Sequence, residues 1–134
     1  MKAISIWQPW AYALVTRIKK IETRSWTTNH RGPLLIHAAK RFPATAKDFA
    51  MTERTLGRCP ARLPFGVIIG FVNLADIKRT EDVVQEISAL ERLYGNYSSG
   101  RYAWITGSCK LFESPIPFTG RQGIFNVPDE IVKL

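Results

Sequence analysis

The sequence lacks the features that mark several large classes of protein. Its two cysteines, Cys59 and Cys109, form no Cys-x-x-Cys pair, which excludes the usual cysteine-rich metal sites. No apolar run approaches the ~18 residues of a transmembrane helix. The apolar N-terminus is interrupted at Gln8-Pro9, too early for the core of a signal peptide. We therefore expect one cytoplasmic domain, residues 1–134, with reduced thiols and no membrane partner.

Motifs of the common cofactor-binding and catalytic sites are also missing. The chain has no Gly-rich phosphate loop, no Rossmann fingerprint, no His-Glu-x-x-His and no Gly-x-Ser-x-Gly. Carboxylates are scarce in the first half, which argues against a two-metal nuclease site there. We expect neither a metal nor a cofactor. A catalytic cysteine paired with His30 or His37 stays open, although we expect His37 to be a hydrogen-bonded strand residue.

Positive charge is abundant and unevenly distributed along the chain. The formal net charge is +8; residues 1–66 hold twelve Lys/Arg and three Asp/Glu, whereas residues 67–134 hold seven and eight. The balance is therefore +9 in the first half and −1 in the second. If the fold gathers the first half on one side, that side attracts a polyanion, most commonly a nucleic acid. A membrane surface usually requires a basic amphipathic helix, and these cations are spread over turns and strand ends.

Apolar patterning predicts about six short strands and two or three helices. Strands are expected at 3–7, 20–26, 34–38, 66–74, 101–112 and 124–127, and helices at 9–18, 43–57 and 80–94. The near-continuous apolar run 67–72 indicates a strand buried on both faces. Trp7 and Trp10 are expected to fill the core. Because the strands neither alternate cleanly with helices nor all run antiparallel, we predict an α+β fold with a small, partly closed barrel.

The most polar part of the chain, residues 17–26, is the candidate site. It contains four cations, one carboxylate and no Gly or Pro, and its last seven residues can form a strand. Alternation then places Glu22, Arg24 and Trp26 on one face, with Lys19 at the entrance to the strand. The same spacing also allows Glu22 and Arg24 to form only a surface ion pair, worth ~0–1 kcal/mol. Both interpretations stay open at this point.

This stretch resembles the motif of the ASCH domain family, Gly-x-Lys-x-x-Glu-x-Arg, with Lys19, Glu22 and Arg24 in register. Similarity to the ASCH domains of cointegrator proteins and to small bacterial ASCH proteins covers essentially the whole chain. It extends through the segments 4–11, 25–26, 30–32, 66–70 and 120–128.

One position departs from the motif, because its leading glycine is Arg17 here. Glycine takes a left-handed conformation at a helix end without steric cost, whereas another residue is disfavoured there by ~1–2 kcal/mol. We therefore expect the preceding helix either to run on or to turn differently. The placement of Lys19 relative to the motif depends on which of these occurs.

The resemblance implies a PUA-like barrel with a cleft between barrel and helices, and a role in RNA metabolism or nucleic-acid binding. In a binding module for RNA or a nucleotide, Glu22 accepts a hydrogen bond from a base amino group, and Ser25 is a further ligand-binding candidate. Trp26 or Tyr102 stacks on an exposed base, a contact worth ~1–3 kcal/mol. The cations assigned to phosphates are Lys19, Arg24, Arg31, Arg41 and Arg121.

The resemblance is also compatible with an enzymatic function. Some small ASCH proteins are amidohydrolases acting on N4-acetylcytidine, with a motif lysine as base and a threonine nucleophile, and some are associated with ribonuclease activity. That threonine occupies the position of Glu22 here, and alternation points Thr23 to the other face, so we do not expect that mechanism. Lys19 and Glu22 could still act as a general acid/base pair. A third possibility is an interaction domain whose basic half contacts an acidic protein partner.

Overall fold

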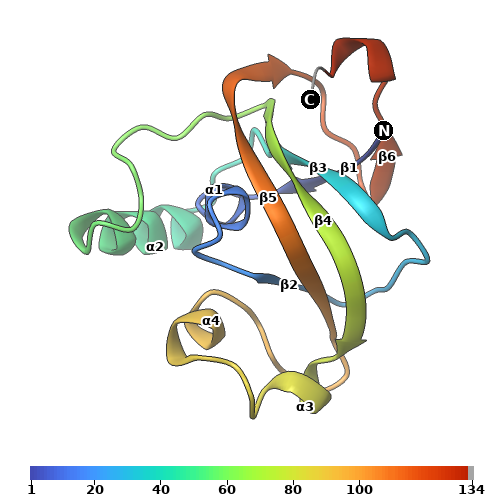
Figure 1. The fold of residues 1–134 in the computed structure, drawn as a ribbon. Helices are drawn as coiled ribbons and strands as arrows, with labels where there is room; N and C mark the ends of the chain where they lie inside the picture. The colour runs from blue at the N-terminus through green and yellow to red at the C-terminus, as the bar shows by residue number, and fades with distance from the viewer. Residues whose placement is uncertain (133–134) are drawn as a thin grey trace.

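The structure of the protein is a computed structural model that describes residues 1–132, and it is built on one twisted sheet (Figure 1). The strands are β1 (Lys2–Ile6), β2 (Ile21–Arg24), β3 (Gly32–Ala38), β4 (Val67–Arg79), β5 (Tyr102–Pro117) and β6 (Ile124–Asn126). The helices are α1 (Trp10–Val15), α2 (Ala44–Thr55), α3 (Thr80–Val83) and α4 (Ala89–Leu93), followed by a 3₁₀ helix at Asp129–Ile131. The predicted α+β class is confirmed, and so are six strands near their expected positions.

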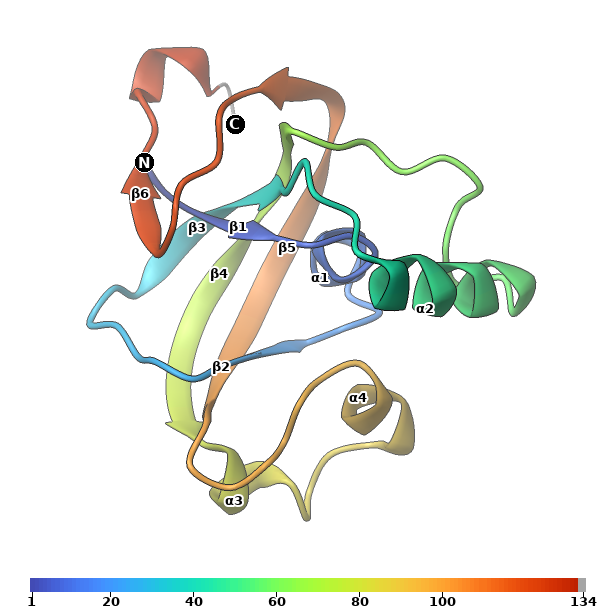
Figure 2. The same ribbon diagram turned by 180° about the vertical axis from the view of Figure 1, so that it is seen from behind.

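The sheet has the strand order β2-β5-β4-β3-β1-β6, in which β1 and β3 pair in parallel and the other neighbours are antiparallel. The long strands β4 and β5 cross the molecule as a twisted pair (Figure 2), with register shifts that mark bulges. Bulges increase the local twist and help a sheet to curl. The result is the half-barrel that the PUA-like expectation describes.

The side chain of Arg24 links one edge strand of the curled sheet to the strand beside the opposite edge. Arg24 stands at the end of β2, which is one edge strand, and its Nη2 donates to the Ser5 carbonyl of β1 over 3.2 Å. β1 lies next to the opposite edge strand, β6. The gap in the barrel is therefore bridged by a side chain rather than by strand pairing, which leaves room there for a cavity.

The inner face of the sheet packs against α1 to form the main core. Ile4, Leu14, Ile36 and Trp104 come from β1, α1, β3 and β5, and each is at most 2% exposed. Positions 68–70 of β4 are consecutively buried, which confirms that this strand is covered on both faces over that part. The core thus fixes the strand ends that surround the gap.

The third predicted helix, residues 80–94, is wrong as a single element. Two short helices, α3 and α4, replace it, because Ser88 takes an extended conformation and its hydroxyl accepts a hydrogen bond from the Glu91 N–H over 3.0 Å. This local cap starts a new helix and overrides the apolar stripe. β4 and β5 run five residues past their predicted ends at 74 and 112, because they pair with each other along that length.

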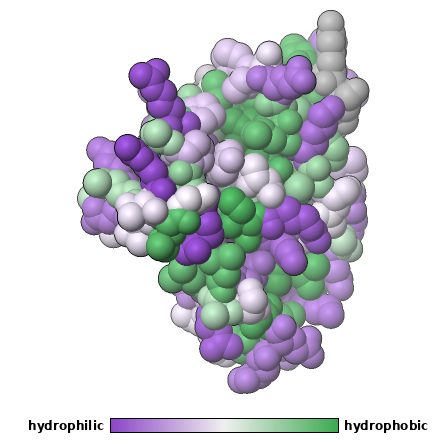
Figure 3. Space-filling view, turned by 60° about the vertical axis from the view of Figure 1, so that its left-hand side comes forward, coloured by the Kyte–Doolittle hydropathy of each residue, from purple (hydrophilic) through white to green (hydrophobic). Residues whose placement is uncertain are grey.

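Helix α2 lies on the surface on the side away from β6 (Figure 1), within its predicted range of 43–57. Its buried residues are Ala46, Ala50 and Glu53. Figure 3 brings this side of the molecule forward and shows hydrophobic residues lying between hydrophilic ones on the surface. Leu56, directly after α2, is 57% exposed. The helix therefore contributes a few buried side chains. Among them, Glu53 matters most for the site.

Arg17 takes the place of the motif glycine at the end of α1. Its φ is 64°, the left-handed conformation that glycine adopts without cost. The guanidinium donates to the Gly107 carbonyl of β5, and the Lys19 N–H donates to the Ala13 carbonyl over 3.0 Å. The helix ends at Val15, so the expectation that it reaches residue 18 is wrong and the left-handed turn is kept. This turn directs Lys19 into the interior.

Glycine and alanine at position 17 should differ in stability. Both substitutions remove the guanidinium contact, but only glycine takes the left-handed conformation without a steric penalty. We expect the free energy of unfolding in urea to be about 1 kcal/mol higher for Arg17→Gly than for Arg17→Ala. This difference is the steric penalty of alanine, reduced by the greater conformational entropy of glycine in the unfolded chain. Equal free energies would show that the turn carries no backbone strain.

Candidate functional site

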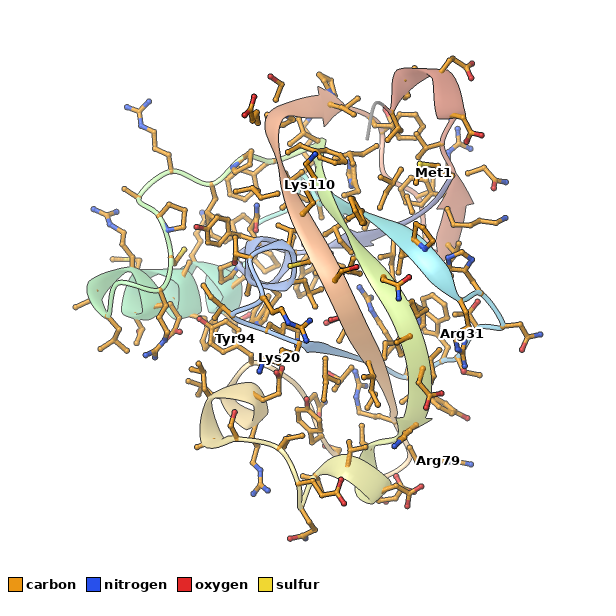
Figure 4. All side chains as sticks on the ribbon, viewed as in Figure 1. Met1, Lys20, Arg31, Arg79, Tyr94 and Lys110 are labelled. Atoms are coloured by element: carbon orange, nitrogen blue, oxygen red, sulfur yellow. The ribbon has the colours of Figure 1, made fainter. Side chains whose placement is uncertain are left out.

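Lys19 is buried at the centre of the candidate site. Its side chain is 1% exposed, and its Nζ donates to the Tyr94 carbonyl over 2.7 Å and lies 3.5 Å from Glu22 Oε1. Burial lowers the pKa of Lys19, and the neighbouring carboxylates of Glu22 and Glu91 partly offset that effect. Figure 4 shows Tyr94 beside the start of β2, close to the labelled Lys20. A buried ammonium needs such partners, because removing one leaves an uncompensated charge in the interior.

Glu22 has a cation on each side. Its Oε2 lies 3.0 Å from Arg24 Nε, and its Oε1 faces Lys19. The side chains of Glu22 and Arg24 are 13% and 26% exposed, whereas that of Lys19 is closed off. The structure thus brings the three motif residues into one row: Glu22 and Arg24 as strand alternation predicted, and Lys19 from the entrance to the strand. Because its inner member is buried, this row is more than an ion pair on a sheet surface.

A cavity of about 520 Å³, which we call the motif cavity, opens in front of this row. It lies between the end of β1, strand β2 and the segment that follows α4. Its walls include Trp10, Glu22, Arg24, Ser25, Trp26 and Tyr94. Lys19 is not part of the lining, because it stands behind Glu22. The Glu22 carboxylate is therefore the group offered to a ligand, and Lys19 is the residue that positions it.

A larger groove of about 1120 Å³, which we call the outer groove, adjoins the motif cavity. The two share a wall formed by Ser5, Trp7, Arg24 and Trp26. The cations that line the outer groove are Arg24, Lys40, Arg41 and Arg121. No Asp or Glu is among its lining residues in the described part of the chain. An extended anionic ligand could pass from one space to the other over the shared wall.

Trp7 does not fill the core, so that expectation was wrong. Its side chain is 42% exposed in the shared wall, and the Arg41 guanidinium carbon lies 5.5 Å from its ring centroid. Trp10, in contrast, stacks on Phe49 with centroids 5.2 Å apart, as a packed residue should. Gln8 is fully buried and donates to the Pro64 carbonyl, which turns the chain directly after Trp7. The Gln-Pro break after the strand is the sequence signal that could have located this exposed aromatic.

The nine site residues predicted from the sequence separate into four groups. Four line the motif cavity, namely Glu22, Arg24, Ser25 and Trp26, and of these Arg24 and Trp26 also line the outer groove. Arg41 and Arg121 line the outer groove alone, Lys19 lies behind Glu22, and Arg31 and Tyr102 are elsewhere. Arg31 donates to two carbonyls of its own turn and lies away from Tyr94 in Figure 4. Tyr102 packs beneath the Arg79 guanidinium, 5.3 Å from its ring centroid. Neither residue lines the motif cavity or the outer groove.

Tyr94 is anchored from the side opposite to Lys19. Its hydroxyl donates to Glu53 of α2, and Arg58 donates to the two Glu53 oxygens over 2.7 and 3.0 Å. The Tyr94 ring also packs on Phe49, with centroids 5.0 Å apart. Helix α2 therefore fixes the peptide whose carbonyl receives the Lys19 ammonium. Sequence analysis missed this network because its members are far apart along the chain and follow no periodic pattern.

The histidines have structural partners, and neither thiol has the character of a catalytic nucleophile. His37 lies 2.9 Å from Ser5 Oγ through Nδ1 and 2.7 Å from the Phe118 carbonyl through Nε2, and His30 Nε2 lies 2.8 Å from the Pro33 carbonyl. Cys59 and Cys109 are free, and burial raises the pKa of the Cys59 thiol, which disfavours the reactive thiolate.

Within residues 1–132, no three His, Cys, Asp or Glu side chains are grouped as metal ligands would be. None of the helices described is both long and apolar enough to traverse a bilayer.

Comparisons with known proteins agree with the family and the fold that the sequence motif indicates. A model of the ASCH domain matches residues 4–116. Activating signal cointegrator 1 is 40% identical over 79 residues in Homo sapiens and 39% identical over 79 residues in Mus musculus. Each alignment covers 54% of this chain and 14% of the relative, so the chain spans a small part of those proteins. The crystal structure of ASCH from Zymomonas mobilis superposes with a TM-score of 0.62 at 16% identity, over 97% of this chain and 89% of that chain. At this identity the likeness concerns the fold alone.

The lowered pKa of Lys19 predicts that its contribution to stability depends on pH. Between that lowered value and 10.5, its ordinary value, the unfolded chain binds more protons than the folded protein, so the free energy of unfolding rises with pH. Lys19→Met removes this dependence. As the pH rises towards 10.5, we expect urea unfolding to favour the unsubstituted protein progressively over Lys19→Met, by at most about 1.4 kcal/mol per pH unit. A constant difference would contradict the buried placement of the ammonium.

Proposed function

Because the chain belongs to the ASCH domain family, which is associated with RNA binding, we propose that it binds RNA across the motif cavity and the outer groove. The outer groove carries the proposal: its lining holds four cations and, among the residues described, no carboxylate. Phosphates require such a surface, and cations dominate the affinity of proteins for nucleic acids. Arg41 and Arg121 are both exposed and come from two different segments of its lining, so they are natural phosphate contacts.

The motif cavity supports recognition of one base beside that groove. The Glu22 carboxylate accepts hydrogen bonds, so it pairs with a base that carries an exocyclic amino group. Lys19 and Arg24 hold it in place before a ligand arrives, which reduces the cost of ordering on binding. Trp26 packs edge-on against Trp104, with centroids 4.9 Å apart, and forms a rigid aromatic wall. A cytosine, adenine or guanine therefore suits the cavity better than uracil.

Removing two of the three exposed cations that line the outer groove should weaken RNA binding and flatten its dependence on salt. Each phosphate contact to a single strand contributes about −0.7 to the slope of log affinity against log salt concentration. For Arg41→Gln with Arg121→Gln we expect the slope to become less steep by about 1.4. Fluorescence anisotropy of a labelled single-stranded RNA at several salt concentrations measures this change.

The matched control is Arg62→Gln with Lys110→Gln, which removes the same charge from exposed sites that line neither cavity. Its slope should stay within error of that of the unsubstituted protein. If the two double variants lose affinity and slope equally, binding reflects net charge and the outer groove has no special role. If neither changes, RNA does not contact Arg41 or Arg121.

A second candidate function is hydrolysis of RNA or of a nucleoside amide such as N4-acetylcytidine. The observation that favours it is the lowered pKa of Lys19 beside a carboxylate that faces the motif cavity. Thr23 also lines the motif cavity, although strand alternation pointed it to the other face, but its hydroxyl accepts a hydrogen bond from the Asn96 N–H over 3.0 Å and is tied to the segment after α4. In this candidate, Glu22 rather than Thr23 contacts the substrate.

Mass spectrometry separates the two candidate functions. Single-stranded RNA and N4-acetylcytidine are incubated with the protein and with Glu22→Gln, which keeps the shape of the side chain and removes its charge. If the protein only binds RNA, both compounds stay intact with either protein. RNA fragments or free cytidine that disappear with Glu22→Gln would establish hydrolysis as the function.

A further inference from the structure

We propose that Trp7 is a second stacking platform, and that the site holds two consecutive nucleotides of a single strand. One base enters the motif cavity and its neighbour stacks on Trp7, while the backbone continues into the outer groove. This inference rests on the proposed function. It adds the ligand class, which is a single strand of at least two nucleotides. It also adds Trp7, a residue that belongs neither to the sequence motif nor to the predicted site.

The packing of the fold does not account for the exposure of Trp7. Tryptophan is highly buried on average, yet Trp7 is 42% exposed and belongs to no core cluster of the described residues. Its surroundings are nevertheless fixed. The next residue, Gln8, is fully buried and bonded to the Pro64 carbonyl, and the Trp7 carbonyl accepts from the Ala11 N–H over 3.1 Å. A rigidly mounted, exposed indole is what base stacking requires.

The position of Trp7 decides what it can bind. It stands in the wall shared by the motif cavity and the outer groove, together with Arg24 and Trp26. A base on Trp7 is therefore next to a base in the motif cavity. Arg24 Nε lies 3.0 Å from Glu22 Oε2 as an ion pair without hydrogen-bond geometry, and Nη2 donates to the Ser5 carbonyl. Nη1 is the donor that a phosphate between the two bases would take.

Arg41 makes the platform suitable for a nucleotide rather than for an apolar ligand. Its guanidinium carbon lies 5.5 Å from the Trp7 centroid, a cation–π distance that keeps the positive charge beside the ring. A nucleotide presents both a flat base and a phosphate, and Trp7 with Arg41 offers a partner to each. Stacking on an aromatic side chain tolerates every base, because each has a π-face.

The far side of the outer groove is also rigid. His37 lies 2.7 Å from the Phe118 carbonyl, and a Cβ on Gly120 would lie 2.6 Å from His37 Cε1. The segment that carries Arg121 is thus pressed onto β3, which sets the distance from Trp7 to the next phosphate contact. A paired duplex cannot use this arrangement without flipping bases out of the stack, which costs a few kcal/mol, so we infer that the ligand is single-stranded.

The test compares ligands of one and two nucleotides by titration calorimetry, with the methyl ester of cytidine 5′-monophosphate and cytidylyl-3′,5′-cytidine, which each carry a single phosphodiester charge, as probes. With the unsubstituted protein we expect the dinucleotide to bind roughly 5- to 150-fold more tightly, the range that one stacked base supplies. Trp7→Ala should bring this ratio close to one, and Trp7→Phe should retain part of it. The matched control is Leu56→Ala, an exposed apolar residue outside both spaces, which should keep the full ratio.

The outcomes separate this inference from the function on which it rests. If Trp7→Ala keeps the full ratio while RNA binding still depends on Arg41 and Arg121, the second platform is refuted and RNA binding stands. If the unsubstituted protein binds both ligands equally, the site holds one nucleotide and the inference is again overturned. If it binds neither these ligands nor longer RNA, both proposals fail together. A duplex of the same sequence that binds as tightly as the single strand would contradict the ligand class.

Discussion

The structure of the site depends on the burial of one ammonium group, that of Lys19. A charge in the interior is tolerated only with well-placed partners, and the fold supplies them from three directions. The turn at Arg17 directs Lys19 inward, β2 brings Glu22 to 3.5 Å, and the segment after α4 provides the Tyr94 carbonyl at 2.7 Å. Tyr94 in turn is held by Glu53 and Arg58. Elements that share no strand pairing therefore meet at this group, and the orientation of Glu22 follows from it.

The half-barrel explains why two spaces meet at this point. The curled sheet does not close by strand pairing, and Arg24 spans the gap with one bond to the Ser5 carbonyl. Space remains on both sides of this bridge: the motif cavity towards α4 and the outer groove towards the segment that carries Arg121. The first presents a fixed carboxylate and the second presents cations. A base offers hydrogen-bond donors and a phosphodiester backbone offers negative charge, so one strand of RNA can bind in both spaces.

Much of the fold and part of the site could be predicted from the sequence, and the reasons differ between elements. Period-two alternation placed Glu22 and Arg24 on one face, because alternation is a local property of a strand. It could not show that Lys19 is buried, since its partner Tyr94 lies 75 residues away. The apolar stripe at 80–94 gave one helix where the cap at Ser88 makes two. Hydrophobicity placed Trp7 in the core, whereas the chain turns at Gln8 and leaves the indole outside.

The central claim, that single-stranded RNA lies across the motif cavity and the outer groove, is tested most directly by an amide NMR titration. The backbone N–H signals are assigned and followed while a short single-stranded RNA is added. The account predicts that the signals that shift belong to segments that line the two spaces, residues 4–7, 22–26, 37–41, 93–96 and 117–123. Shifts confined to α2 or to the β4–β5 end near Arg79 would contradict it, and so would a spectrum that RNA leaves unchanged.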